Sequence, residues 1–209
     1  MPGILLPEIE HYLERLIPER PEPLRTMEVL GAEKGFPIIG PACGRVLMQL
    51  AAMIGAMRVL ELGSGYGYSA CWFALGMPEG GEIICTDGDP ALREAALGYF
   101  KTLGRNVRYD FRVGNALDII QELDGPFDII FNDIDKHQYP ATIPLVVPKL
   151  RSGGLFVTDN TLWSGQVARP IVDPITASVH KFNQAIFAHP ELMTSIIPLR
   201  DGLAVSVKR

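Results

Sequence analysis

Three oxygen-bearing side chains stand at the ends of two apolar runs of sequence. Asp133 lies in the stretch IIFNDIDK, and Asp159 and Asn160 end the stretch LFVTDN. Carboxylate and amide oxygens, without sulfur or imidazole, are typical ligands of a hard cation such as Mg²⁺, which keeps positions for water and substrate oxygens. These residue types predict a metal-assisted group transfer, with purely structural acids at strand ends as the alternative.

A glycine-rich turn, ELGSGYG, lies upstream of these acids. Gly63, Gly65 and Gly67 follow an apolar run and lead into a predicted helix, so the backbone can approach a ligand closely. A dinucleotide fingerprint would need a further glycine where Tyr68 stands. Glu61 would repel a pyrophosphate but suits an amine or a sulfonium. The turn therefore favours S-adenosylmethionine (SAM), which carries both cations and no phosphate.

Two further segments could complete a nucleoside pocket. Asp87 ends the run IICTD and is placed to accept hydrogen bonds from ribose hydroxyls, with a solvated turn residue as the alternative. In VGNALD, Asn115 and Ala116 lie where an adenine ring would reach, although the segment by itself is typical of a helix cap.

If the sheet is parallel, further residues are expected beside these acids. Asp133, Asp135, Lys136, Asp159 and Asn160 would then all lie at the carboxyl edge of the sheet, where ligands of such folds bind. Lys136 is either an ion-pair partner of these acids or a general base whose pKa a neighbouring dication lowers. Position alone leaves both roles open.

The elements that must position these residues alternate from Arg58 onward. Apolar runs without alternation indicate strands covered on both faces, hence a parallel sheet with helical crossovers. The predicted strands are MRVLEL, EIICTD, VRYDFRV, FDIIFND and GGLFVTD, and the predicted helices between them span residues 68–75, 90–103, 116–123 and 139–150. This order predicts an α/β fold, a doubly wound, Rossmann-like and mostly parallel sheet.

Additional elements flank this core. Three helices are predicted before the first strand, near residues 9–17, 24–34 and 44–54, and one helix at 177–188 follows it. SIIPL and LAVSVK, separated by Asp201 and Gly202, predict a C-terminal antiparallel edge hairpin. We expect a single domain over residues 1–209, with N-terminal helices at 1–57 and the Rossmann-like core at 58–209.

Composition narrows the environment and the partners. The net charge of -5 comes from interspersed charges, which indicates neither a nucleic-acid nor a membrane partner. Cys43, Cys71 and Cys85 lack zinc or CxxC spacing and are expected to be reduced, buried thiols. No secretory leader or membrane-spanning segment is evident, so a cytoplasmic protein is expected.

The motifs together resemble the cation-dependent, SAM-dependent O-methyltransferases of the caffeoyl-CoA and catechol O-methyltransferase type. The resemblance runs from about residue 28 to the C-terminus and rests on these segments: GAEKGFPIIGPACGRVL, VLELGSGYGYSA, FDIIFNDIDKHQYP, GGLFVTDNTLWSGQV and DGLAVSVKR. DNTLWSG and DIDK at their mutual distance are specific to that family, whereas the glycine turn is shared with most SAM-binding domains. Relatives often carry Asp where Asn115 stands.

This resemblance implies the role of each site residue. The cofactor-binding residues would be Ile39, Glu61, Gly63, Ser64, Ser69, Asp87, Ala116 and Asp135. Asp133, Asp159 and Asn160 would bind a divalent cation, with Mg²⁺ expected from the donor types. Lys136 and Asp133 would be catalytic. Trp163 and Ser164 would lie next to a small hydroxyl acceptor of the catechol or vicinal-diol kind. A homodimer through the N-terminal helices is also implied.

Three other functions stay open from the sequence. A methyltransferase for a hydroxyl of a modified RNA nucleotide would need a basic surface, for which the candidates are Arg105, Arg108, Arg112, Lys149, Arg151 and Arg169. A non-catalytic SAM-binding module would not need Lys136 or the predicted metal ligands. A nicotinamide oxidoreductase fits the fold class but conflicts with the glycine spacing and with Glu61.

Overall fold

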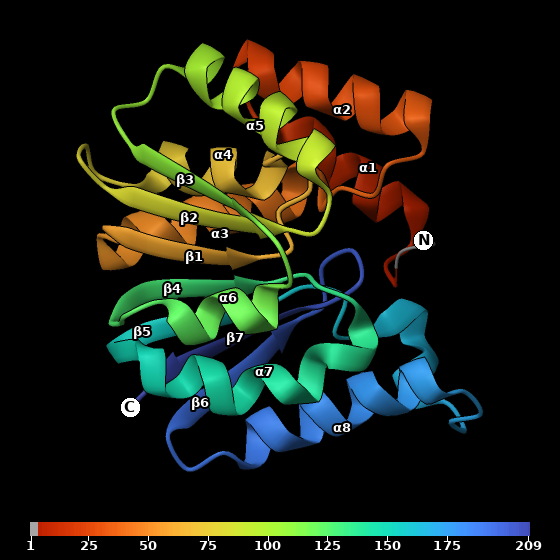
Figure 1. Ribbon diagram of the computed structural model, residues 1–209. Coiled ribbons are helices and arrows are strands. Elements are labelled where there is room, and N and C mark those ends of the chain that lie inside the picture. Colours follow the sequence, from red (N-terminus) through yellow and green to blue (C-terminus); the bar gives the residue numbers. More distant parts are fainter. Residues whose placement is uncertain (1–3) are drawn as a thin grey trace.

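The computed structural model describes residues 4–209, which form a seven-stranded sheet with helices on both faces (Figure 1). The strand order is β3-β2-β1-β4-β5-β7-β6. Strands β1 to β5 pair in parallel, and β7 pairs antiparallel with both β5 and β6. The strands are β1 (Arg58–Leu62), β2 (Glu82–Asp87), β3 (Arg108–Val113), β4 (Phe127–Asn132), β5 (Leu150–Thr158), β6 (Leu192–Ile197) and β7 (Leu203–Lys208).

Helices cover the two faces of the sheet in two groups (Figure 1). One apolar cluster joins the sheet to α2, α3, α4 and α5, and the other joins it to α6, α7 and α8. The α-helices are α1 (Pro7–Leu16), α2 (Glu22–Lys34), α3 (Gly40–Ile54), α4 (Tyr68–Gly76), α5 (Pro90–Leu103), α6 (Ala116–Glu122), α7 (Tyr139–Val146) and α8 (Pro174–Ala188). Within residues 4–209 every helix is too short or too polar to cross a lipid bilayer.

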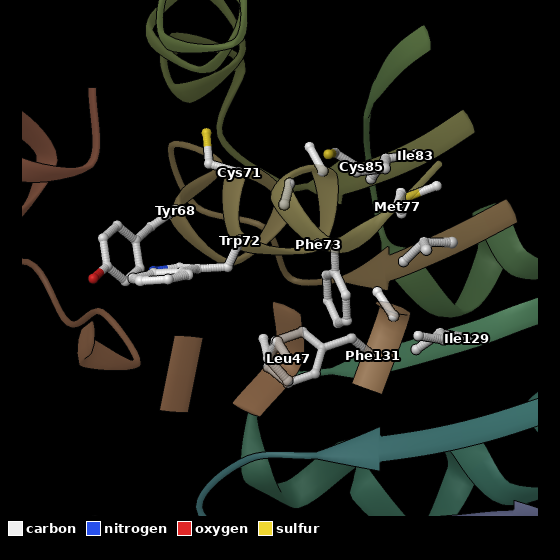
Figure 2. Packing of buried hydrophobic residues seen from close by; sticks show 14 of the residues in the cluster. Leu47, Tyr68, Cys71, Trp72, Phe73, Met77, Ile83, Cys85, Ile129 and Phe131 are labelled. Atoms are coloured by element: carbon white, nitrogen blue, oxygen red, sulfur yellow. The ribbon is translucent and has the colours of Figure 1, made fainter. Parts of the chain in front are cut away.

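Helix α4, which begins directly after the glycine turn, is held by an almost completely buried surface. Phe73 points toward Phe131 of β4 and Leu47 of α3, with the two phenyl rings edge to face at 5.7 Å between centroids (Figure 2). The Trp72 ring occupies the space that a side chain at position 44 would need, since an ideal Cβ on Gly44 would lie 2.2 Å from the indole nitrogen. This packing fixes α4, and with it the turn that precedes it, against the sheet.

The predicted fold class is confirmed, and several elements differ from the prediction at their ends; α8, for example, begins at Pro174 rather than residue 177. The helix expected over residues 139–150 ends at Val146, because Pro148 cannot donate the next helical hydrogen bond and Leu150 pairs with Phe127 in the sheet. Helix α3 begins at Gly40 rather than residue 44, since Pro41 suits a first helical turn. The strand expected at SIIPL begins earlier, at Leu192. All three cysteines are free and buried.

Candidate active site

The predicted site residues gather at the carboxyl ends of the parallel strands. Neighbouring β1 and β4 lead into helices on opposite faces of the sheet, which opens a crevice beyond their ends. A cavity of about 680 Å³ fills this crevice. Ten of the predicted residues line it: Ile39, Gly63, Ser64, Ser69, Asp87, Asp133, Asp135, Lys136, Asp159 and Asn160.

The glycine turn forms one wall of this cavity by close backbone contact. Gly63, Gly65 and Gly67 have φ values of 81°, 51° and 87°, a left-handed conformation that favours glycine. At Gly63 a Cβ would also lie 2.6 Å from the Asp133 carbonyl oxygen. The amides of Gly63 and Ser64 donate to the Thr86 carbonyl at 3.1 and 2.8 Å, so the turn is tied to β2.

Asp87 lies between this cavity and a second one of about 500 Å³, which Ala116 also lines. One Asp87 carboxylate oxygen accepts from the Gly65 amide at 2.9 Å and the other from the Asp89 amide at 3.0 Å. Asn115 caps α6 by accepting from the Leu117 amide at 2.8 Å, as its sequence context suggested. The positions expected for ribose and adenine thus lie side by side.

Glu61 is fully buried at the end of β1 without a positive partner. Neither of its carboxylate oxygens has a hydrogen-bond partner among residues 4–209. Burial raises its pKa to about 8, against the opposing effect of the nearby Ser69 and Ser64 hydroxyls. An unpaired buried carboxylate is costly, so this position favours a ligand that brings a positive charge or donors.

Asp159 and Asn160 directly follow β5, on the other side of the crevice. Asp159 is 1% exposed, and its Oδ1 atom has no hydrogen-bond partner among the described residues. Its backbone carbonyl accepts from the Tyr139 hydroxyl at 2.9 Å, which fixes the chain at this point. The Asn160 amide nitrogen lies 3.5 Å from an Asp201 carboxylate oxygen, which orients its side chain. Asn160 has a φ of 55°, the left-handed conformation that Asn tolerates.

Asp133 and Lys136 form an ion pair beside them. The Lys136 Nζ atom donates to Asp133 Oδ1 at 2.7 Å and to the Ile134 carbonyl at 3.3 Å. Burial raises the pKa of Asp133 despite the nearby positive charges of Lys136 and Arg200. Burial, followed by the charge of Asp133, raises the pKa of Asp159 to about 7. The cavity is therefore short of positive charge where the two acids meet.

This donor set suits a hard cation by its chemistry. Two carboxylates and an amide supply oxygen atoms only, and the unpartnered Oδ1 of Asp159 is free to act as a ligand. No cluster of three or more His, Cys, Asp or Glu side chains with metal-site geometry exists within residues 4–209. A cation would thus depend on Asn160 and on water or substrate oxygens as well as on the two carboxylates.

Some predicted site residues lie outside the cavity walls, Glu61 among them, and several residues that were not predicted line the larger cavity. Trp163 and Ser164 line neither cavity, and the Ser164 amide donates to Asp201. Arg200 and Asp201 line the larger cavity from the turn between β6 and β7. The sequence motif Asp201-Gly202 predicted this turn, but nothing local indicated that it would reach the site.

The fold and the crevice define a Rossmann-like methyltransferase. The family described as O-methyltransferase matches residues 24–209. The chain is 31% identical to caffeoyl-CoA O-methyltransferase 1 of Eucalyptus globulus, covering 94% of this chain and 86% of that protein. It is 30% identical to catechol O-methyltransferase of Niastella koreensis, covering 95% and 96% respectively.

Solved structures agree with the sequence relatives. The O-methyltransferase from Bacillus cereus in complex with SAH superposes with a TM-score of 0.86 at 26% identity, over 97% of each chain. The chain therefore belongs to the O-methyltransferase family, which confirms the predicted family and enzyme class.

Proposed function

We propose that the protein transfers the methyl group of SAM to one hydroxyl of a small aromatic vicinal diol that a divalent cation holds. The observation that carries this proposal is the pair of buried, incompletely satisfied carboxylates: Glu61, one residue before the end of β1 and beside the glycine turn, and Asp159 on the cavity wall. Each position favours a positive charge. The amine of SAM suits the position beside Glu61, and a divalent cation suits the position beside Asp159.

The donor would lie along the first wall of the crevice. The amine of SAM would lie against Glu61. The methionine part would be held by Ser64, Ser69 and Gly63, and the ribose would reach Asp87. The Ile39 backbone and Asp135 would close this pocket, and Ala116 would lie beside the adenine in the second cavity. SAH in the Bacillus cereus structure supports a donor of this kind.

Asp133, Asp159 and Asn160 would hold the cation, with Mg²⁺ the ion that their oxygen atoms suit. When bound, such an ion would orient both hydroxyl oxygens of the acceptor and lower their pKa. Lys136 lies at the same wall, 2.7 Å from Asp133, and as the neutral amine it would accept the proton of the reacting hydroxyl. Asp133 would thus serve both the cation and the base.

The remaining catalytic contribution of the chain is positioning. The acceptor oxygen attacks the methyl carbon as the bond from that carbon to sulfur breaks, and the charges of oxyanion and sulfonium both fade in this step. The rigid glycine turn and the anchored end of β5 would hold donor and acceptor in line. We propose that the protein works as a homodimer on a small molecule in the cytoplasm.

The charges outside the crevice support a small acceptor over an RNA. Arg108 pairs with Glu82, Arg112 with Asp110, and Arg151 with Asp128. Arg105 donates to backbone carbonyls of α4 and of the residue after it. Lys149 donates to the Leu123 carbonyl. Five of the six basic candidates for an RNA acceptor are therefore engaged within the protein, and Arg169 is the exception among residues 4–209.

Methyl transfer from labelled SAM to a panel of catechols, with and without chelator, tests the proposal. We expect turnover of diols that disappears with chelator and returns with Mg²⁺, and no turnover of the corresponding single phenols. Equal turnover of RNA, or turnover that chelator leaves unchanged, would contradict it. Binding of SAM without transfer to any diol would favour a non-catalytic module.

A further inference from the structure

Arg200 is a guanidinium that the fold holds at the crevice without hydrogen bonds. Among residues 4–209 its side chain makes none, and its Nη1 atom lies 4.0 Å from Asp159 Oδ2. The side chain is 35% exposed. The N–H groups of Arg side chains usually donate to carboxylates, phosphates or carbonyls. Because those of Arg200 do not do so within the described residues, they are available to a ligand.

The backbone at this position holds the side chain in place. Arg200 has a φ of 54°, a conformation that residues with a Cβ rarely adopt. Its carbonyl accepts from the Ile4 amide at 3.1 Å, and the Gly202 amide donates to the Leu199 carbonyl at 2.9 Å. The side chain lies against Gly40, with its Cδ and Nε atoms 3.9 Å from an ideal Cβ there. An unusual conformation held by its surroundings at a cavity wall suggests a functional role.

Charge balance indicates the kind of ligand. Lys136 and Arg200 are the basic residues that line the larger cavity in the described chain, and Lys136 is hydrogen-bonded to Asp133. A cation bound at Asp159 would compete with Arg200 for that carboxylate. The guanidinium would then face the acceptor with its charge uncompensated. The other cavity acids, Asp135 and Asp201 among them, disfavour a multiply charged phosphate.

We infer that Arg200 selects acceptors that carry a carboxylate, so that the preferred substrates are dihydroxybenzoate-like acids rather than neutral catechols. This inference rests on the proposed function, because it assigns the acceptor of the same site. Arg200 is a specificity residue in this scheme: it binds the acceptor carboxylate and takes no part in the proton or methyl transfer. Its planar donors match the two oxygens of a carboxylate.

The alternative role of Arg200 is that of a counter-ion for protein acids. Asp159 is one such acid, and Glu10 of α1 lines a smaller cavity of about 110 Å³ together with Arg200. Among the described residues, the buried Glu10 Oε1 atom has no hydrogen-bond partner. If Arg200 acts only as a counter-ion, its loss affects charged and neutral acceptors alike, and this difference makes the two roles separable.

The test compares 3,4-dihydroxybenzoate with its neutral isostere 3,4-dihydroxybenzamide. For wild-type protein, Arg200→Gln and the control Arg45→Gln, which removes an exposed charge on α3, the KM for each acceptor is measured with SAM and Mg²⁺. Calorimetry of each acceptor with SAH and Mg²⁺ gives Kd without turnover. We expect Arg200→Gln to weaken the benzoate about tenfold or more and the benzamide less than about twofold, with the control unchanged.

Equal weakening of both acceptors, or wild-type affinities that do not distinguish them, would overturn the inference. Arg200→Gly, which the left-handed backbone favours, replaces Arg200→Gln if that variant does not fold. Absence of transfer to every diol by the wild-type protein would instead count against the proposed function, while the calorimetric comparison still decides the role of Arg200.

Discussion

Replacing Glu61 by glutamine is expected to stabilise the ligand-free protein near neutral pH. Burial raises the pKa of this carboxyl from 4.5 to about 8, so the folded protein keeps a proton that the unfolded chain releases between these values. Each pH unit across this window lowers the free energy of unfolding by about 1.4 kcal/mol. Near pH 7 the free energy of unfolding of the wild-type protein is thus about 3 kcal/mol lower than at pH 4.5 because of this group. A glutamine at this position does not titrate, so the variant avoids this loss.

Urea unfolding of wild type and Glu61→Gln at several pH values measures this difference. The two free energies of unfolding should lie closest near pH 4.5 and diverge as the pH rises toward 8, since the destabilising effect of the raised pKa grows across that window. Glu79→Gln is the matched control, because it makes the same chemical change at an exposed position. Its effect should stay within about 0.5 kcal/mol at every pH.

Binding of SAM should favour the wild-type glutamate over the glutamine variant. If the amine of SAM lies against Glu61, the carboxylate becomes charged on binding and releases its proton, and Glu61→Gln weakens SAM by about tenfold to a hundredfold. Calorimetry in buffers of different ionisation enthalpy measures both effects. The assignment of Glu61 as an unpaired carboxyl that binds the amine of SAM would be refuted by a variant that is less stable than wild type near pH 7. A variant that binds SAM as tightly as wild type would also refute it.

Two further substitutions test the wall of the crevice. Asp87→Ala should weaken SAM by about 1 to 3 kcal/mol in calorimetry, because the ribose hydroxyls lose a charged acceptor; an unchanged Kd would remove Asp87 from the pocket. Gly63→Ala should destabilise the protein by about 2 to 4 kcal/mol in urea unfolding, since it combines a left-handed φ of 81° with a Cβ 2.6 Å from the Asp133 carbonyl. Gly80→Ala, with a φ of 80° and open space around it, should cost about 1 to 2 kcal/mol, and equal effects would contradict the steric account.

The convergence of the acids could be predicted because it follows from local patterns. Continuous apolar runs indicate parallel strands, and parallel strands bring their carboxyl ends to one edge, so Asp133, Asp159 and Asn160 had to lie near one another. The structure places all three on the wall of one cavity. Their metal-binding role stays a prediction.

The contribution of the C-terminal turn could not be predicted in this way. Arg200 and Asp201 reach the cavity because β7 inserts antiparallel between β5 and β6, which aligns the turn with the end of β5. The position of β7 depends on pairing between strands that are far apart in the sequence. The hairpin pattern alone is compatible with either β6 or β7 beside β5. Helix ends were missed for local reasons, as at Pro148, where a strand pairing competes with the helical pattern.

The central claim, transfer to a diol that depends on a cation held by Asp159, is tested most directly by one comparison. Asp159→Ala and wild-type protein are assayed for methyl transfer to a catechol across Mg²⁺ concentrations, with SAM binding measured in parallel by calorimetry. The account predicts that the variant loses Mg²⁺-dependent transfer and retains its affinity for SAM, since Asp159 faces the proposed cation site. Mg²⁺-independent turnover by the wild type, or undiminished turnover by the variant, would contradict it.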